Sequence, residues 1–242
     1  MSVTKNSIFQ FKQFAVDQTG CAMKVNTDGV LLGVLTSAVN PQRILDIGTG
    51  TGVIALILAQ RFPCAKITAL DIDASAAATA DLNFASSPFS PRLQGVHASF
   101  EEYFQNHHPD KFNLIVSNPP FFIDSLRSDN ATKGLARHTD QLFYETLLQN
   151  SARHLEAGGQ IALIVPIRIS EFVQKLSNSF GLHLQTSISI KSFTESEPHR
   201  KILILSFSAE EVEQTDFIIY AGQGTYSAEY QNLLKDYFTI FS

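Results

Sequence analysis

Cysteine is scarce in this chain of 242 residues, which contains only Cys21 and Cys64. A scaffold held together by disulfides is therefore excluded, and a reduced, cytoplasmic setting is expected. Charged residues are also few, at 17% against about a quarter in an average domain. No apolar run approaches the roughly 18 residues of a membrane span, and the first seven residues lack the apolar core of a signal peptide. We expect a soluble cytoplasmic protein with no membrane partner.

Metal ligands at a recognisable spacing are missing as well. His107 and His108 are adjacent, but no cysteine or acidic residue stands at ligand spacing from them, so no metal site is predicted. Internal repeats and low-complexity tracts are absent. General disorder is excluded because 44% of the residues are hydrophobic, 19 of them phenylalanine.

The net charge of −5 argues weakly against a nucleic-acid partner. Its distribution weakens that argument, because residues 210–242 hold six acidic residues and one basic residue. The other 209 residues balance at 17 bases and 17 acids. A locally basic face is therefore compatible with the composition, although composition alone does not indicate one.

Apolar runs bounded by turn residues predict alternating helices and strands from about residue 28. The expected strands are 43–47, 65–70, 93–98, 112–117 and 160–165, and the expected helices are 28–39, 53–61, 74–84, 140–155 and 170–179. Residues 119–138 are expected to form a loop. Residues 182–192 and 201–208 alternate like an antiparallel pair, and 217–220 could add another strand. Residues 226–238 resemble a terminal helix. This order predicts an α/β domain with a parallel sheet and an antiparallel addition at one edge, preceded by an extension at residues 1–26.

The segment DIGTGTG, residues 46–52, lies between a predicted strand and a predicted helix. Closely spaced glycines permit a tight turn and close approach of a ligand, and the helix N-terminus offers free N–H groups. Asp71 ends the next strand, 19 residues after Gly52, at the spacing of a carboxylate that binds ribose hydroxyls. A nucleoside ligand is therefore predicted, the alternative being a structural turn with a helix cap.

The glycine spacing distinguishes two classes of nucleotide-binding protein. Dinucleotide dehydrogenases use G-x-G-x-x-G, whereas Gly48, Gly50 and Gly52 follow G-x-G-x-G, with Val53 where the last glycine of the longer motif belongs. Opened by Asp46, this pattern resembles the first motif of the Rossmann-like, class I S-adenosylmethionine-dependent methyltransferases.

That resemblance implies a seven-stranded, mostly parallel sheet with one antiparallel edge strand and helices on both faces. It implies S-adenosyl-L-methionine as cofactor, with its amino-acid end over the glycine loop, its ribose at Asp71 and Ile72 beside its adenine. Many members carry an aspartate at the end of the third strand to read the adenine amine. Here Ala98, Ser99 and Phe100 stand there, so Ser99 or a backbone group is expected to substitute.

The tetrapeptide NPPF, residues 118–121, follows the strand 112–117, where an open parallel sheet binds its ligands. The side-chain oxygen of Asn118 and the carbonyl of Pro119 could accept both hydrogens of an exocyclic amine and direct its lone pair at the methyl group. Phe121 could stack on a base that has left its own stack. The motif resembles that of methyltransferases acting on adenine N6, cytosine N4, guanine N2 or a protein glutamine. The alternative is an ordinary turn, because Asn-Pro is a common turn pair.

Three further segments narrow the resemblance. They are FKQF at 11–14, CAMKVNTDGVLLG at 21–33 and EPHRK at 197–201. Together with residues 118–121 they look like the bacterial tRNA (adenine-N6)-methyltransferase family that acts on A37 of valine tRNA. By this analogy Lys24, Thr27 and Asp28 lie near the methionine end of the cofactor, and the extension 1–26 packs on the cofactor site of a methyltransferase domain at 27–242.

The resemblance implies a tRNA substrate, and we expect a monomer. The segment after the NPPF motif could contact RNA phosphates through Arg127, Lys133, Arg137 and His138. A second basic group comprises Lys191, His199, Arg200 and Lys201. Ordinary solvated surface is the alternative for both groups. For the protein as a whole, the alternatives are methylation of an rRNA base, of a protein glutamine or of DNA, and a nucleotide-binding module or dehydrogenase.

Overall fold

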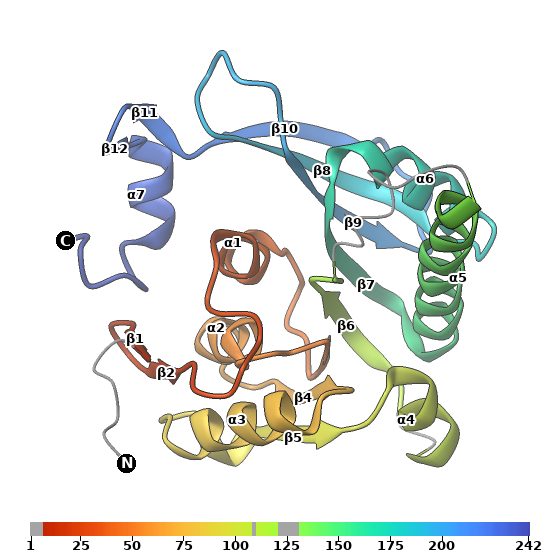
Figure 1. The fold of residues 1–242 in the computed structure, drawn as a ribbon, viewed down its shortest axis with the longest axis horizontal. Coiled ribbons are helices and arrows are strands. Elements are labelled where there is room, and N and C mark those ends of the chain that lie inside the picture. Colours follow the sequence, from red (N-terminus) through yellow and green to blue (C-terminus); the bar gives the residue numbers. More distant parts are fainter. Residues whose placement is uncertain (1–6, 108–109, 121–130) are drawn as a thin grey trace.

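The computed structural model describes residues 7–107, 110–120 and 131–242. Their central feature is an eight-stranded sheet in the order β10-β8-β9-β7-β6-β3-β4-β5 (Figure 1). All neighbours pair in parallel except β9, which is antiparallel to both β7 and β8. The strands are β3 Arg43–Ile47, β4 Lys66–Asp71, β5 Leu93–His97, β6 Phe112–Ser117, β7 Leu155–Pro166, β8 His183–Lys191, β9 Arg200–Ser206 and β10 Glu213–Ile218.

The Rossmann-like, mostly parallel sheet is confirmed, but it has eight strands where seven were expected. The additional strand is β10, which pairs with β8 and forms the edge. Its first four residues, 213–216, are exposed and carry two acidic side chains, which suits an edge because charge discourages pairing with another chain. The antiparallel strand β9 lies between β7 and β8, because residues 202–205 are apolar and buried on both faces.

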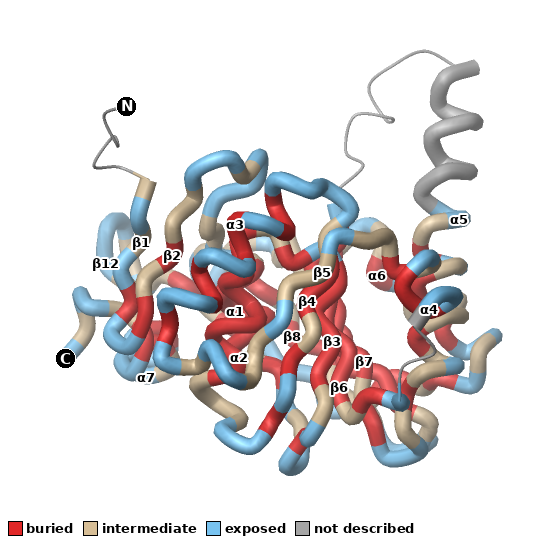
Figure 2. The backbone as a smooth tube through the Cα atoms, turned by 90° about the horizontal axis from the view of Figure 1, so that it is seen from below, coloured by how far each residue is buried: buried red, intermediate tan, exposed pale blue. Residues whose placement is uncertain are grey.

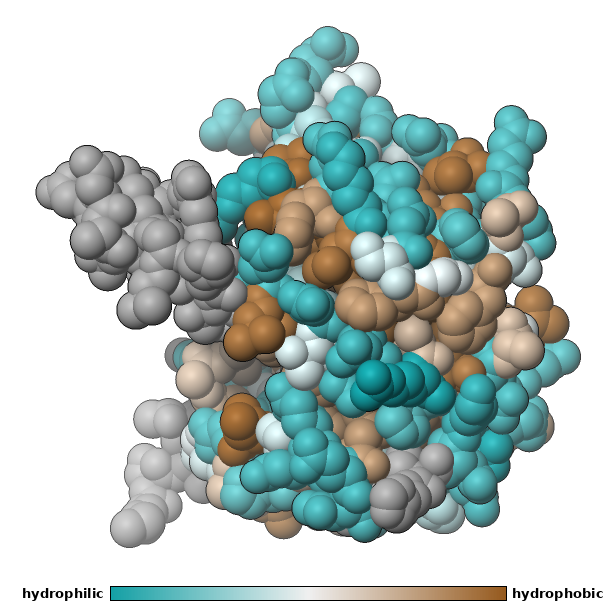
Figure 3. All heavy atoms as spheres, turned by 90° about the vertical axis from the view of Figure 1, so that its right-hand side faces the viewer, coloured by the Kyte–Doolittle hydropathy of each residue, from teal (hydrophilic) through white to brown (hydrophobic). Residues whose placement is uncertain are grey.

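Helices cover both faces of the sheet, as expected (Figure 1). Alternate residues of each strand point to opposite faces, so Ile44 and Leu114 belong to one hydrophobic cluster while Leu45 and Ile115 belong to the other. The first cluster lies under α1 Thr27–Leu35, α2 Val53–Arg61 and α3 Ala74–Ala85, and the second under α4 Phe100–His107, α5 Ala131–His154 and α6 Ile167–Asn178. On the side that carries α4, α5 and α6, hydrophilic and hydrophobic residues are interspersed over the surface (Figure 3).

The N-terminal and C-terminal segments lie against each other on the face that carries α1 and α2 (Figures 1 and 2). An antiparallel hairpin, β1 Ile8–Gln10 with β2 Ala15–Asp17, contacts the C-terminal segment through the Phe11–Phe238 bridge. Asn83 of α3 holds this hairpin by accepting the Asp17 amide at 2.8 Å and donating to the Asp17 carbonyl at 2.9 Å. The C-terminal elements are β11 Tyr220–Gly222, β12 Thr225–Tyr226 and α7 Ala228–Leu234.

Several helix boundaries differ from the predicted ones for local reasons. Helix α1 ends at Leu35 rather than residue 39, because the Thr36 hydroxyl bonds the Leu32 carbonyl and Arg61 donates to the Gly33 carbonyl at 2.7 Å. Helix α5 begins at Ala131, so residues 131–138 are helical where a loop was predicted. Within the described ranges, no helix is long and apolar enough to cross a membrane.

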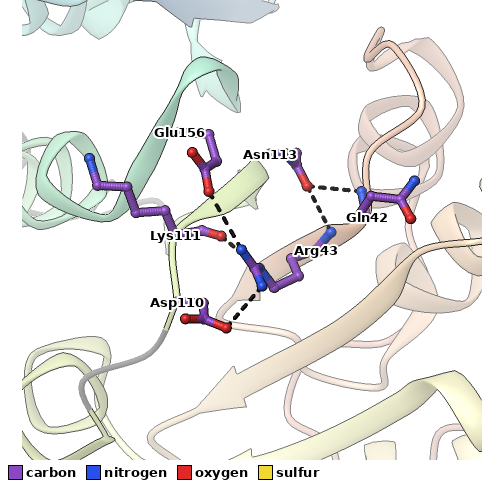
Figure 4. A network of polar contacts seen from close by, with 6 residues as sticks. All are labelled: Gln42, Arg43, Asp110, Lys111, Asn113 and Glu156. Carbon is purple, nitrogen blue, oxygen red and sulfur yellow. Dashed lines mark hydrogen bonds and ion pairs between the residues drawn. The ribbon is translucent and has the colours of Figure 1, made fainter.

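A polar network joins three strands at the amino edge of the sheet (Figure 4). Arg43 donates to the Lys111 carbonyl and to Asp110, both at 2.9 Å, and its guanidinium lies 3.5 Å from Glu156. The Asn113 side-chain oxygen accepts two backbone amides at the start of β3. Because the Arg43 side chain is 43% exposed, its ion pairs contribute no more than about 1 kcal/mol. This edge therefore serves strand registration, and a cavity lies at the opposite, carboxyl edge.

Candidate active site

A cavity of about 400 Å³ opens at the carboxyl ends of β3, β4 and β6. These strands are parallel neighbours, so their carboxyl ends meet at one edge of the sheet, which is where open α/β folds bind their ligands. The cavity gathers residues from distant stretches of the chain, namely Cys21, Ala22, Met23, Ile47, Gly48, Gly50, Leu70, Asp71, Ile72, Asp73, Ala76, Ala98, Ser99, Phe100, Glu101, Ser117, Asn118, Pro120 and Phe143.

The glycine loop between β3 and α2 forms the floor of this cavity. Gly48 and Gly50 have φ of +75° and +57°, and an added Cβ at either would meet no atom within 4 Å. Their backbones therefore face open space that a ligand could fill. Gly52 also has positive φ but does not line the cavity. It packs closely under Phe84 instead, since an added Cβ at Gly52 would lie 2.5 Å from that ring. The structure thus gives the third glycine a packing role under α2.

Asp71, the last residue of β4, lies beside the glycine loop as the spacing predicted. One carboxylate oxygen accepts the Gly50 amide at 2.8 Å, and the other accepts the Asp73 amide at 2.9 Å. These bonds fix the carboxylate at the wall of the cavity while leaving lone pairs on both oxygens. The arrangement can accept further hydrogen bonds from a pair of hydroxyl groups.

Asp46 lies beneath the loop and is fully buried, so it does not line the cavity. One of its oxygens accepts the Thr49 hydroxyl at 2.7 Å, and the other has no hydrogen-bond partner among the described residues. Burial raises the pKa of this carboxyl to about 7, with the Thr49 bond opposing the shift and the charge of Asp71 adding to it. Asp46 therefore shapes the loop through Thr49, and a nearby positive charge would stabilise its ionised form.

Ile72 and Ser99 both line the cavity, but Ile72 is exposed to solvent whereas Ser99 is engaged in hydrogen bonds. Ile72 is 74% exposed, which is unusual for a large apolar side chain at a cavity and leaves a surface for a flat ring. Ser99 is the N-cap of α4: its hydroxyl accepts the Glu102 amide at 3.1 Å, and its amide donates to the Glu102 carboxylate at 3.2 Å. This reciprocal pair is the capping box that the sequence SFEE could have revealed, together with the helix α4 that sequence reasoning missed.

Asn118 follows β6 directly and reaches the cavity with a side chain that is only 9% exposed. Its side-chain oxygen is buried without a hydrogen-bond partner among the described residues. The preceding Ser117 donates its hydroxyl to the Ile47 carbonyl at 2.8 Å, which holds the ends of β6 and β3 together. A buried acceptor that no described residue satisfies can take a hydrogen bond from a ligand, so Asn118 is a candidate ligand contact in this cavity.

The remaining predicted residues around the NPPF motif either do not line the cavity or lie outside the described residues. Pro119 is buried and does not line the cavity, whereas Pro120, which sequence reasoning did not single out, does. Phe121 and Arg127 lie outside the described residues, as does His108. Within the described part of the chain, no three histidine, cysteine or acidic residues are grouped so that they could hold a metal ion.

Lys24 and Thr27 are not brought to the cavity. Thr27 lines a second cavity of about 340 Å³, between the N-terminal hairpin and Tyr226 and Tyr230, and Lys24 is exposed and lines neither. The cap of α1 is Asn26, whose side chain accepts the Gly29 amide.

Residues close to Lys24 and Thr27 in the sequence do line the first cavity. Residues 21–23 line the first cavity from the N-terminal side and Phe143 from α5. The Phe143 ring packs edge-on against Phe100 at 6.0 Å. No local signal could have revealed this contribution of Phe143, because it depends on how α5 packs.

The fold and this site together define a Rossmann-like S-adenosylmethionine-dependent methyltransferase. The family model described as Methyltransferase small domain matches residues 25–191. The fold itself is shared with a solved structure described as a predicted O-methyltransferase from Agrobacterium tumefaciens. That structure has a TM-score of 0.64 and 17% identity over 85% of this chain and 94% of the other.

Two relatives narrow the class. Proteins named tRNA1(Val) (adenine(37)-N6)-methyltransferase from Pedobacter heparinus and Bacteroides thetaiotaomicron are 44% and 40% identical to this chain. Each alignment extends over 234 residues, which is 96% of this chain and 98% of the relative. The chain belongs to the tRNA1(Val) (adenine(37)-N6)-methyltransferase family.

Proposed function

We propose that this protein transfers the methyl group of S-adenosylmethionine to the exocyclic N6 of A37 in a valine tRNA, the adenine beside the anticodon. The observation that carries the proposal is Asn118, whose buried side-chain oxygen lacks a donor among the described residues and lies in the same cavity as the glycine loop and Asp71. The names of the two relatives supply the substrate.

The described residues fit the cofactor. Gly48 and Gly50 leave open space over their backbones, and the Asp71 carboxylate can accept the ribose hydroxyls. The exposed Ile72 side chain can cover one face of the adenine. Asp46 would contribute to cofactor binding indirectly, because it holds the glycine loop through its hydrogen bond with Thr49. When bound, the cofactor supplies an electrophilic methyl group on a sulfonium.

Asn118 would act on the acceptor base. An adenine amine is a weak nucleophile because its lone pair is delocalised into the ring. By accepting one of the amine hydrogens, the Asn118 oxygen would favour the more tetrahedral nitrogen of the transition state and hold its lone pair toward the methyl group. The Pro119 carbonyl would accept the second hydrogen of the amine, and Phe121 would stack on the base.

We propose that RNA phosphates contact the first basic group, because three of the four residues of the second group, all but Lys201, are paired or uncharged. Lys191 is neutralised by Asp216 at 2.6 Å, and Arg200 by Asp28 at 2.8 Å. Burial and the adjacent charge of Arg200 lower the pKa of His199 below its ordinary value, so this side chain is uncharged at neutral pH. We therefore propose Arg127, Lys133 and Arg137 as phosphate contacts.

The remaining proposals concern the molecule as a whole. We propose that the extension 1–26 and the domain 27–242 form one folded unit, since residues 21–23 line the cavity and the hairpin bonds to α3. We also propose that the protein acts as a monomer in the cytoplasm, where its tRNA substrate is found.

The proposed reaction is tested by incubating the protein with labelled S-adenosylmethionine and, separately, with bulk tRNA, rRNA, DNA or protein. Nucleoside mass spectrometry of the tRNA should show N6-methyladenosine, and sequencing of the modified fragment should place it at position 37 of a valine tRNA. Label found instead on rRNA, guanine, cytosine or a protein glutamine would overturn the proposal.

The affinity for tRNA should fall with salt, because each phosphate that the protein neutralises releases counterions. Replacing Arg127, Lys133 and Arg137 by alanine should flatten the slope of log K against log salt by up to about one for each cation removed from a phosphate. Lys191→Ala is the matched control, since its ammonium already pairs with Asp216. A wild-type slope in the triple variant, measured by filter binding, would show that these cations are merely solvated.

Two glycine variants should separate fold from binding. Gly52→Ala combines a positive φ with a clash against Phe84, so it should lower the free energy of unfolding by about 2–4 kcal/mol. Gly50→Ala bears only the backbone strain, about 1–2 kcal/mol, but its methyl group projects into the cavity and should weaken cofactor binding at least tenfold. Denaturant titration and calorimetry check the two effects. Equal stability losses would contradict the role given to Gly52.

A further inference from the structure

The proposed cofactor would present an adenine to the cavity, and the residue expected to bind the adenine amine, Ser99, already makes other hydrogen bonds. The Ser99 hydroxyl accepts the Glu102 amide, and the Ser99 amide donates to the Glu102 carboxylate. Both groups are therefore committed to capping α4. Reading an exocyclic amine requires an acceptor, and the capping bond uses one of the two lone pairs of the Ser99 hydroxyl, whereas a carboxylate without a partner offers several.

Three carboxylates line the cavity, and two of them have backbone partners. Asp71 accepts the amides of Gly50 and Asp73, and Asp73 accepts the Ser75 amide as the N-cap of α3. Glu101 is the third, and among the described residues no hydrogen bond or ion pair engages its carboxylate. Its lone pairs remain available to a ligand.

The position of Glu101 favours a charged acceptor beside an apolar slot. Glu101 stands in the first turn of α4, where the helix dipole stabilises a negative charge. Ile72, Ala98 and Phe100 line the same cavity and offer apolar surface to a flat ring. An ionised carboxylate accepts hydrogen bonds and donates none, so it suits an amine and repels a carbonyl oxygen.

We propose that Glu101 reads the 6-amino group of the cofactor's adenine and thereby excludes 6-oxo purines. The inference rests on the proposed use of S-adenosylmethionine and assigns to Glu101 the role that sequence reasoning gave to Ser99. A purine with a 6-oxo group would bring an acceptor against this carboxylate in place of the two N–H donors of the amine.

Calorimetry with two ligands tests the assignment: S-adenosylhomocysteine and its 6-oxo analogue S-inosylhomocysteine. The wild-type protein should prefer the adenosyl ligand by at least about tenfold, the scale of one hydrogen bond to a charged group. Glu101→Gln should reduce that preference to within a few-fold, because the glutamine amide can donate to the 6-oxo group. Glu102→Gln is the matched control: glutamine still accepts the Ser99 amide, so the wild-type preference should remain.

Three outcomes would overturn the proposal, in two different ways. A wild-type preference retained by Glu101→Gln, or lost in Glu102→Gln instead, would place the reading of adenine on another group while leaving the proposed function intact. Failure of the wild-type protein to bind either ligand would reject the cofactor assignment itself, and the role of Glu101 with it.

Discussion

Replacing Asn118 by alanine is expected to lower the rate of tRNA methylation by about 100-fold or more, the scale of one lost transition-state hydrogen bond. The side-chain oxygen is buried and without a described partner in the free protein, so its bond to the adenine amine would form only with substrate present. Single-turnover rates with saturating tRNA and cofactor, read out as N6-methyladenosine, measure the effect.

Binding measurements and a second variant separate this effect from damage to the site. Asn118→Ala should bind S-adenosylhomocysteine within a few-fold of wild type, because we place the side chain against the acceptor base. Asn118→Asp keeps an acceptor oxygen but adds a charge and loses the amide donor, so its rate tests whether an acceptor alone suffices. Full activity in Asn118→Ala would rule out the proposed positioning of the amine.

The parts of this site that the sequence could predict are those formed by residues close together in the chain or by neighbouring strands. Strands β3 and β6 match their predicted bounds residue for residue, because each is a short apolar run ended by a turn signal. The placement of Asp71 beside the loop also follows from local order, since parallel strands bring their carboxyl ends together. These features require no knowledge of tertiary packing beyond the sheet.

Features that depend on distant packing could not be predicted. The three glycines look alike in sequence, and only the position of Phe84 on α3 gives Gly52 a different role from Gly50. Only the apolar end of β10, from Phe217, is predicted as a strand; its first four residues have no apolar run, and their pairing with β8 depends on long-range register. The resemblance predicts Thr27 near the cofactor, whereas in the structure Thr27 follows the Asn26 cap of α1 and lines the second cavity.

Asp71→Ala is expected to weaken S-adenosylhomocysteine binding by about 100-fold or more. Two hydrogen bonds from the ribose to a charged acceptor would be removed, each contributing about 1.5–3 kcal/mol. The same carboxylate also accepts the Gly50 and Asp73 amides, so the change could loosen the loop and reduce affinity indirectly. Affinity alone therefore does not establish that Asp71 touches the ribose.

A ligand lacking the ribose 2′-hydroxyl resolves the two contributions. If Asp71 binds the ribose directly, wild type should bind S-adenosylhomocysteine at least tenfold more tightly than its 2′-deoxy analogue, and Asp71→Ala should bind both about equally. Loosening of the loop alone would weaken both ligands in parallel and preserve their ratio in the variant, because the hydroxyl would still meet its true partner. Calorimetry on the four pairs of protein and ligand gives the coupling directly, and thermal unfolding without ligand shows whether the variant remains folded. A ratio unchanged by the substitution would remove Asp71 from the ribose and leave it a residue that holds the glycine loop.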